Sequence, residues 1–279
     1  MLAEKLLFFA GAGAISEAML KGLLEAGVVP AEQITVNNRK NRERLFQLGQ
    51  SYGIHISQQR EQEIAAADII ILAMKPFDIH QALQEIGANI TPQQMVISVV
   101  AGVSTETIES QLVEGVAVIR AMPNTSSFVQ ASATAISRGK HATIEQLEQG
   151  KQIFAAIGSV TEVEEQQLDA VTGLSGSGPA YIYYVIESLM QAGQQVGLSE
   201  ETCRELLIQT LYGSAKMLKV TGKNPQELRR QVTSPNGTTM AGLAVLEQGD
   251  LPDLLKKAVE QATRRATEMG QEISAMQPT

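Results

Sequence analysis

The chain has 279 residues, of which 44% are hydrophobic and 19% are charged, and its formal net charge at pH 7 is −8. This length allows one large or two ordinary domains, each with a buried core. The acidic balance argues against a protein that binds the phosphate backbone, because sequence-independent affinity for nucleic acid needs clustered lysine and arginine. We therefore expect no nucleic-acid partner.

The cysteine content and the apolar runs indicate where the protein resides. A single cysteine, Cys203, excludes an internal disulfide and is compatible with the reducing cytosol. The longest apolar run, residues 69–74, is far too short to cross a bilayer. The apolar start of the chain is also short and passes directly into a glycine turn, unlike a signal peptide. The sequence thus predicts a cytoplasmic protein with no membrane association.

The chain begins with an apolar strand over residues 5–10, which runs into the turn Gly11-Ala12-Gly13 and then into a helical pattern. This order of elements brings unpaired backbone N–H groups and the positive end of a helix dipole to a diphosphate. Ser16 stands at the third glycine position of the dinucleotide fingerprint, so an ordinary glycine turn stays open as an alternative. Ser16 and Ala18 are small enough to let the helix pack close to the strand. We predict a dinucleotide site at this turn.

The second predicted strand, residues 34–38, indicates which dinucleotide is bound. NAD sites usually place Asp or Glu at the end of this strand, about 20 residues past the glycines, to accept hydrogen bonds from the ribose hydroxyls. Here the strand leads into Asn37-Asn38-Arg39-Lys40, with Arg42 and Arg44 following, which offer donors and positive charge instead. A solvated charge run at the start of a helix would have the same composition. The position favours NADPH as the cofactor, with NADH as the alternative.

Apolar, β-branched runs recur through the first part of the chain, and most of them are separated by helical patterns. They cover residues 5–10, 34–38, 68–74, 95–100, 116–122 and 133–137, with a last edge strand at 159–163. This alternation predicts a doubly wound α/β sheet. Helical patterns follow over residues 181–196, 200–219, 225–232, 240–248 and 252–269. We expect an α/β domain over residues 1–163 and an all-helical domain over residues 164–279.

The first two long helices of the predicted helical domain, residues 181–196 and 200–219, carry few charges for their length. A helix that is apolar over most of its circumference is buried on several sides, and a small domain offers limited interior for that. A compact monomeric bundle remains the alternative. We expect a homo-oligomer in which these helices lie at a subunit interface.

Several segments are candidates for the chemistry. In open α/β sheets ligands bind beyond the carboxyl ends of the strands, where residues 73–76, 100–102 and 120–125 are expected. The helical part contains two loops rich in glycine and hydroxyl side chains, residues 172–179 and 233–239. Each is predicted to end at a helix N-terminus, which can receive a carboxylate or phosphate, although helix capping alone would also use Ser and Thr.

Other kinds of site lack their residues. The three histidines, His55, His80 and His141, are scattered, and no spacing of Cys, His, Asp and Glu fits a metal site. The Gly-Ser-Gly segments around Ser177 have no general base beside them in the pattern, which argues against serine nucleophile chemistry. We expect no metal.

These segments together resemble the pyrroline-5-carboxylate reductase family. Residues 169–181 and 232–239 are similar to the signature of that family, and residues 11–13, 73–76, 101–103, 122–125 and 161–165 match it in order and spacing. The resemblance covers essentially the whole chain. It implies a Rossmann-like doubly wound sheet followed by an all-helical dimerisation domain, with a dimer as the basic unit that sometimes assembles into a decamer. It also implies NAD(P)H-dependent reduction of 1-pyrroline-5-carboxylate to L-proline, the last step of proline biosynthesis.

The resemblance also implies site residues. Cofactor contacts would come from Ala10, Gly11, Ala12, Gly13, Ala14, Ile15, Asn37, Asn38, Arg39, Lys40, Ala73, Met74, Lys75, Pro76 and Ala101. The substrate carboxylate would meet Ser234, Gly237, Thr238 and Thr239, with Glu165 nearby, and Thr239 would be catalytic by orienting the ring. Two positions depart from the family pattern: Asn236 stands where a second glycine is frequent, and Ala14 replaces a larger residue that is usually polar. Asn tolerates positive φ, so the geometry of its loop can persist.

Two other classes of protein remain as alternatives to this family. A β-hydroxyacid dehydrogenase also joins such a sheet to a helical domain, but it relies on a helical lysine, and Lys216 and Lys219 lack the usual surroundings. A regulatory homologue that binds nucleotide or proline without turnover is disfavoured by the intact loops at residues 173–179 and 234–239.

Overall fold

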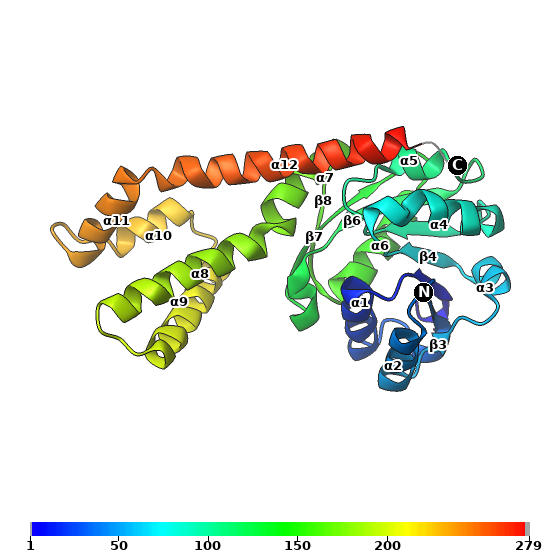
Figure 1. Ribbon diagram of the computed structural model, residues 1–279, viewed down its shortest axis with the longest axis horizontal. Coiled ribbons are helices and arrows are strands. Elements are labelled where there is room, and N and C mark those ends of the chain that lie inside the picture. Colours follow the sequence, from blue (N-terminus) through cyan, green and yellow to red (C-terminus); the bar gives the residue numbers. More distant parts are fainter. Residues whose placement is uncertain (1, 277–279) are drawn as a thin grey trace. The chain divides into compact units, whose positions relative to one another are not determined.

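The computed structural model describes residues 2–276 and divides by its internal contacts into two units (Figure 1). The first, which we call the α/β unit, comprises Met1–Pro179 and Val259–Thr279; the second, the helical unit, is Ala180–Ala258. The end of the last helix therefore packs with the sheet, although it lies farthest from it in the sequence. The predicted boundary of the functional domains after residue 163 stays a prediction.

The α/β unit is built on one sheet. Within the described residues its strands are β1 (Leu7–Ala10), β2 (Ile34–Asn37), β3 (His55–Ile56), β4 (Ile69–Leu72), β5 (Met95–Ser98), β6 (Ala117–Met122), β7 (Ser132–Arg138) and β8 (Gly158–Glu162). Their order is β3-β2-β1-β4-β5-β6-β7-β8, with Phe9 of β1 in register with Val36 on one side and Ile71 on the other. This confirms the predicted doubly wound sheet and its edge strand. β3 is not among the predicted strands, because two residues carry no detectable period.

One strand pair departs from the parallel arrangement. β6 and β7 are antiparallel, whereas the other neighbouring pairs in this sheet are parallel. They are joined through the short 3-10 turn η5 (Thr125–Val129), and a parallel connection would need a crossover of a dozen residues or more. The chain therefore turns back after Met122 instead of crossing the sheet.

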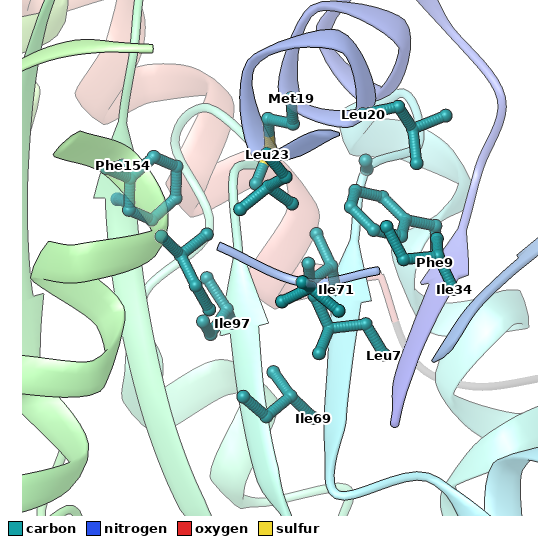
Figure 2. Packing of buried hydrophobic residues seen from close by; sticks show 14 of the residues in the cluster. Leu7, Phe9, Met19, Leu20, Leu23, Ile34, Ile69, Ile71, Ile97 and Phe154 are labelled. Atoms are coloured by element: carbon teal, nitrogen blue, oxygen red, sulfur yellow. The ribbon is translucent and has the colours of Figure 1, made fainter. Parts of the chain in front are cut away.

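Helices cover both faces of the sheet. One hydrophobic cluster joins the sheet to α1 (Ala14–Glu25), α2 (Arg42–Tyr52) and α6 (Ile144–Ala155) (Figure 2). The other joins it to α3 (Arg60–Ala66), α4 (Ile79–Ile86), α5 (Thr105–Glu109) and the end of α12 (Leu251–Ala275). Successive residues of a strand point to opposite faces, so Leu7 and Phe9 enter the first cluster and Phe8 the second. Burial on both faces explains the continuous apolar strands.

The helical unit contains most of α8 (Gly178–Gln195), α9 (Glu200–Thr221), α10 (Pro225–Gln231), α11 (Thr238–Gln248) and the start of α12. The predicted helices are confirmed, and their ends follow local signals. Ser199 caps α9 by accepting from the Thr202 amide, and Gly222 ends it at a φ of 64°. Within residues 180–258, all of which the structure describes, Cys203 alone is buried.

The first predicted glycine loop, residues 172–179, is wrong. Its residues form a π-helical turn, η7 (Thr172–Gly176), that continues from α7 (Leu168–Val171) into α8. The amide of Ser177 donates to Thr172 O at 2.8 Å, and the Thr172 hydroxyl donates to Leu168 O at 2.9 Å, so this hydroxyl serves the helix itself. Gly173 serves packing, because a Cβ there would lie 2.3 Å from Thr263 Oγ1 of α12.

The lengths and compositions of the helices also bear on membranes. None of the helices in the described part of the chain combines the length and the apolar character that a membrane span requires.

Candidate active site

A cavity of about 390 Å³ lies at the carboxyl ends of β1, β2 and β4, where ligands bind in folds of this kind. Its lining comes from several segments brought together by the parallel strands. The lining residues are Phe8, Ala10, Gly11, Ala12, Gly13, Asn37, Asn38, Arg39, Lys40, Arg60, Ala73, Met74, Lys75, Asp78, Ala82, Glu85 and Ile86. We call this cavity the nucleotide pocket.

The glycine turn after β1 forms one wall of the nucleotide pocket. Gly11 has a φ of +131°, and a Cβ there would lie 2.1 Å from Ala73 O of the neighbouring strand connection. Only glycine allows the two backbones to approach so closely. Gly13 then precedes α1, and no side chain caps this helix. The N–H groups of its first turn are therefore available to an anion such as a diphosphate.

The turn is held from behind by α2. Arg44 Nε donates to Ala12 O at 3.3 Å, and the Arg44 guanidinium forms an ion pair with Glu17 of α1. The Tyr52 hydroxyl donates to Glu17 at 3.4 Å, and burial together with the Glu17 charge raises the pKa of Tyr52. Arg44 thus supports the turn and does not line the pocket, although the sequence offered it as a phosphate ligand.

The polar residues after β2 shape a second wall. Asn37 Nδ2 donates to Ser57 Oγ at 3.1 Å, and the Asn38 side chain accepts from the amide of Lys40 at 3.1 Å. Ser57 in turn donates to Glu63 at the start of α3. Burial opposes ionisation of Glu63, but the hydrogen bonds from Ser57 and from the amides of residues 58 and 59 outweigh it and lower the pKa of this carboxyl. The two asparagines are thus fixed by local contacts.

Charged side chains face the nucleotide pocket from several elements. Arg39 Nη2 lies 3.2 Å from Asp78 Oδ1, and Arg60 Nη1 lies 2.7 Å from Glu85 Oε2. Lys40 and Lys75 also line the pocket, and neither has an ion-pair partner among residues 2–276. Positive charge thus exceeds negative charge in the lining. The turn, the uncapped helix and these cations fit a dinucleotide.

Most of the predicted cofactor residues line the nucleotide pocket. The exceptions are Ala14 and Ile15 in the first turn of α1, Pro76 at the start of η3 (Pro76–Asp78), and Ala101. Contact with the cofactor stays a prediction for all of these residues, those in the lining included. Further residues that line the nucleotide pocket, among them Asp78, Ala82 and Glu85, are not among the predicted cofactor residues. Their helical spacing after the predicted strand at 68–74 is the signal that could have found them.

The second predicted glycine loop is confirmed, and it precedes α11. Asn236 adopts a φ of 57°, as the sequence analysis allowed, and Gly237 precedes the helix without a side-chain cap. A Cβ at Gly237 would lie 2.3 Å from Ser234 Oγ, so glycine is needed where the loop folds over this hydroxyl. The predicted substrate residues Ser234, Gly237, Thr238 and Thr239 thus lie together around one exposed helix N-terminus. Their contact with substrate stays a prediction.

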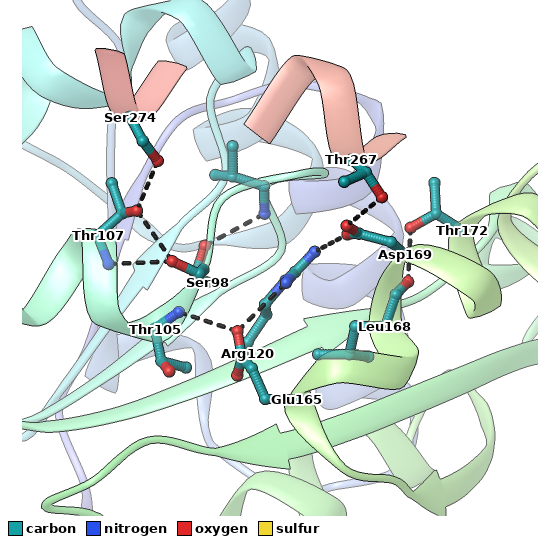
Figure 3. A network of polar contacts seen from close by, with 12 residues as sticks. Ser98, Thr105, Thr107, Arg120, Glu165, Leu168, Asp169, Thr172, Thr267 and Ser274 are labelled. Carbon is teal, nitrogen blue, oxygen red and sulfur yellow. Dashed lines mark hydrogen bonds and ion pairs between the residues drawn. The ribbon is translucent and has the colours of Figure 1, made fainter. Parts of the chain in front are cut away.

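Glu165 belongs to a partly buried polar network in the α/β unit (Figure 3). The side chain of Arg120 on β6 is only 6% exposed, and its Nη1 and Nη2 lie 3.2 Å from Glu165 Oε1 and 2.9 Å from Asp169 Oδ1. The Thr105 amide also donates to Glu165 Oε1 at 3.0 Å, and the Thr267 hydroxyl of α12 donates to Asp169 at 3.0 Å. Glu165 Oε2 is buried and has no hydrogen-bond partner among the described residues. The role of Glu165 as a substrate contact stays a prediction.

The acidic, cysteine and histidine side chains form no metal site in the part of the chain that is described. No group of three or more His, Cys, Asp or Glu side chains among residues 2–276 could hold a metal ion. His80 of α4 lies with its Nε2 2.6 Å from Ile273 O of α12, so this histidine joins the last helix to the sheet unit.

The doubly wound sheet, with a glycine turn, an uncapped helix and cations at the carboxyl ends of its strands, defines a dinucleotide-binding α/β protein. Residues 165–269 match the family model for pyrroline-5-carboxylate reductase dimerisation. The chain is also 40% identical over 270 residues to pyrroline-5-carboxylate reductase 1 of Bacillus subtilis, which covers 97% of this chain and 91% of the relative. The chain belongs to the pyrroline-5-carboxylate reductase family. This confirms the resemblance and disfavours the β-hydroxyacid dehydrogenase alternative.

Solved structures agree with this assignment. A pyrroline-5-carboxylate reductase from Coxiella burnetii matches with a TM-score of 0.88 and 36% identity, over 95% of this chain and 98% of that one. The Plasmodium falciparum pyrroline carboxylate reductase with NADP bound matches with a TM-score of 0.86 and 28% identity, over 97% of this chain and 100% of that one. Residues 5–102 match a family model described as NADP oxidoreductase, coenzyme F420-dependent. The α/β unit thus contains an NADP-binding domain.

Proposed function

We propose that this chain reduces 1-pyrroline-5-carboxylate to L-proline with NADPH, in the last step of proline biosynthesis. The observation that carries the proposal is the nucleotide pocket, found in a chain that is 40% identical to a reductase of this name over 97% of its length. When bound, NADPH supplies a hydride to the carbon of the C=N bond. NADH remains the alternative reductant.

The residues of the nucleotide pocket suit the phosphates of this cofactor. The turn at Gly11 and Gly13 and the first turn of α1 would face the diphosphate, which accepts hydrogen bonds from backbone N–H groups. Lys40 and Lys75 would add positive charge. The absence of an acidic residue at the end of β2 supports NADPH, because the usual acceptor for the ribose hydroxyls of NAD is missing there.

The N-terminus of α11 suits the carboxylate of the substrate. The amides of its first turn have no side-chain cap, and the hydroxyls of Ser234, Thr238 and Thr239 surround them. Such a helix end binds an anion through its N–H groups and its dipole. Glu165 is the further substrate contact that the family resemblance implies.

The proposed reaction needs no general acid or base of the kind that histidine supplies. A protonated imine is already electrophilic at carbon, so the protein has to hold the ring and orient it, which can supply most of the acceleration. We assign the orienting contact to the hydroxyl of Thr239. Hydride addition to the ring carbon gives proline directly, because the ring nitrogen already carries the proton of the protonated imine.

The Thr239→Val variant tests this assignment. The exchange keeps the shape of the side chain and removes its hydroxyl, so we expect kcat with 1-pyrroline-5-carboxylate to fall about 10²-fold, as for loss of one positioned donor. The affinity for NADPH, measured by fluorescence titration, should stay nearly unchanged. Thr239→Ser, which keeps the hydroxyl, is the matched control and should retain most of the rate. Equal losses of turnover and NADPH affinity would contradict the role.

The substrate itself is tested by following NADPH oxidation by absorbance on addition of either 1-pyrroline-5-carboxylate or a β-keto acid. Turnover with the imine alone is the expected result. Turnover with the keto acid would favour the dehydrogenase chemistry, and binding without any turnover would favour a regulatory protein.

We further propose that a dimer of this chain is the functional unit and that the helical unit forms its interface. Large apolar side chains are exposed on α8, α9 and α11, including Tyr184, Ile208 and Val245. Exposed apolar surface on this scale marks an interaction site, and the family model that covers this region is a dimerisation model. Assembly of dimers into a decamer and a cytoplasmic location stay predictions.

A further inference from the structure

One edge of α4 presents a row of acceptors to the arginines of the nucleotide pocket. Gln81 and Glu85 lie one turn apart on α4, and Asp78 is the N-cap residue just before this helix, three residues from Gln81, so the three side chains share one side. Arg39 contacts both Asp78 and the Gln81 side-chain oxygen, Gln81 Nε2 donates to Glu85 Oε1 at 3.0 Å, and Glu85 pairs with Arg60. We call Asp78, Gln81 and Glu85 the α4 acceptor row. Both arginines of the pocket are thus compensated from within the protein.

Arg39 lies where the ribose of a bound dinucleotide is expected, so its pairing with Asp78 bears on which cofactor binds. Arg39 follows β2, the strand whose end meets the adenosine ribose in dinucleotide folds. A phosphate on the ribose 2′ position would have to compete with the Asp78 carboxylate for the guanidinium, and it would also meet the negative charge of that carboxylate. An unphosphorylated ribose meets no such repulsion, and its hydroxyl can donate to a carboxylate.

We propose that Asp78 is a specificity-determining residue that limits the preference for NADPH over NADH by holding Arg39. This inference rests on the proposed dinucleotide site and adds the group that tunes it. Lys40, which lines the same wall without an ion-pair partner among the described residues, supplies the remaining attraction for the phosphate. The α4 acceptor row thus keeps part of the positive charge after β2 from acting on the nucleotide.

Isothermal titration of the full chain with two half-cofactor probes tests the inference without turnover. Adenosine 2′,5′-bisphosphate carries the distinguishing phosphate, and adenosine 5′-monophosphate lacks it. In Asp78→Asn we expect binding of the bisphosphate to tighten about threefold to tenfold, the size of one partly screened charge, and binding of the monophosphate to change less than about twofold. Asp78 makes no capping hydrogen bond to α4, so the exchange leaves the helix intact.

Two further variants show whether the effect is local and acts through Arg39. Asp253→Asn makes the same change of net charge in the helical unit, where Asp253 pairs with Lys257, and it should leave both probes unaffected. Arg39→Met should weaken binding of the bisphosphate and leave binding of the monophosphate unchanged. In a chain that already carries Arg39→Met, the further exchange Asp78→Asn should tighten bisphosphate binding by less than half as much as it does when Arg39 is present. The gain should also shrink as salt rises.

The outcomes separate this inference from the proposed reaction. The inference about Asp78 would be overturned if Asp78→Asn bound the bisphosphate no more tightly than the natural chain does. It would also be overturned if the exchange tightened the binding of both probes equally. A natural chain that binds neither probe would overturn it together with the dinucleotide site. A natural chain that binds both probes but does not turn over 1-pyrroline-5-carboxylate would overturn the proposed reaction, and the ratio of the two affinities would still decide the role of Asp78.

Discussion

The α/β unit and the helical unit place their apolar residues differently. In the α/β unit both faces of the sheet are covered, and side chains as large as Phe8, Phe9 and Phe154 are fully buried. In the helical unit Tyr184 is 72% exposed and Val196 81% exposed. The first unit completes its core within one chain, whereas the second leaves large apolar side chains exposed. A dinucleotide pocket can therefore form in a single chain, whereas the exposed apolar side chains of the helical unit, which matches a dimerisation model, are the surface that the proposed dimer would cover.

The polar groups of the two units also differ in how many of them are paired within the chain. In the α/β unit Arg120 is buried between two carboxylates, and the arginines of the nucleotide pocket are paired with the α4 acceptor row. In the helical unit the N-terminus of α11 has no side-chain cap, and the hydroxyls around it are exposed. In the α/β unit these arginines are compensated within the chain while Lys40, Lys75 and the uncapped α1 stay available to a ligand, whereas the helical unit leaves the N-terminus of α11 available.

The largest effect should come from charging the exposed apolar face of α9. Ile208 and Tyr212 are 53% and 61% exposed and lie one helical turn apart. If a second copy covers them, burying the exposed half of these four side chains per dimer is worth about 3–6 kcal/mol. We expect Ile208→Asp with Tyr212→Asp to give a monomer by light scattering, with a lower thermal midpoint. The exposed polar Gln209→Asp on the same helix is the control.

Nucleotide binding sharpens this test. Since the α/β unit has its own core, the charged double variant should still bind the nucleotide probes while substrate turnover is lost. A double variant that stays dimeric, with the thermal midpoint of the Gln209→Asp control, would contradict the assignment of the interface.

A smaller effect is expected from the buried charge network. Arg120→Met would leave Glu165 and Asp169 without their common counter-ion in a largely buried place, which should cost about 2–4 kcal/mol of unfolding free energy after allowance for their partial exposure. Urea denaturation monitored by circular dichroism measures this loss. Arg120→Lys keeps the charge but cannot bridge two carboxylates in the same way. Its unfolding free energy should therefore lie between those of the natural chain and of Arg120→Met. An Arg120→Met chain as stable as the natural one would show that the network does not hold the unit together.

The smallest effect concerns the wall of the nucleotide pocket and depends on pH. The pKa of Glu63 is lowered from its ordinary value of 4.5, so its contribution to stability is complete above that value and is lost as pH falls through the lowered pKa. We expect Glu63→Gln to cost about 1 kcal/mol near neutral pH, from weakened hydrogen bonds to Ser57 and the following amides.

This cost should disappear in strongly acidic buffer, where the natural side chain is also neutral. Urea denaturation at the two pH values measures it, and Glu61→Gln, in the same first turn of α3, is the matched control. A cost that is the same at both pH values would show that the charge of Glu63 plays no part.

Much of the fold could be predicted because its signals are local. Strands buried on both faces have to be continuously apolar, as β1 and β4 are, and the other predicted runs became β2, β5, β6, β7 and β8. The Gly11 turn was found because its backbone admits no side chain, and most cofactor residues then followed from the ends of parallel strands. Glycine content misled at residues 172–179, since there the glycines serve close packing in a helix and not a loop.

The sequence by itself determined the alternation of strands and helices, the glycine turn at the start of α1, the loop before α11 and the apolar character of α8 and α9. These features follow from steric and hydrophobic constraints that act within a few residues. Only the tertiary structure decided that Arg120 meets Glu165 and Asp169, that Arg39 meets Asp78, and that the end of α12 packs on the sheet. Such contacts join residues distant in the chain, and which charges meet depends on how the helices lie on the sheet, which no short stretch of sequence encodes.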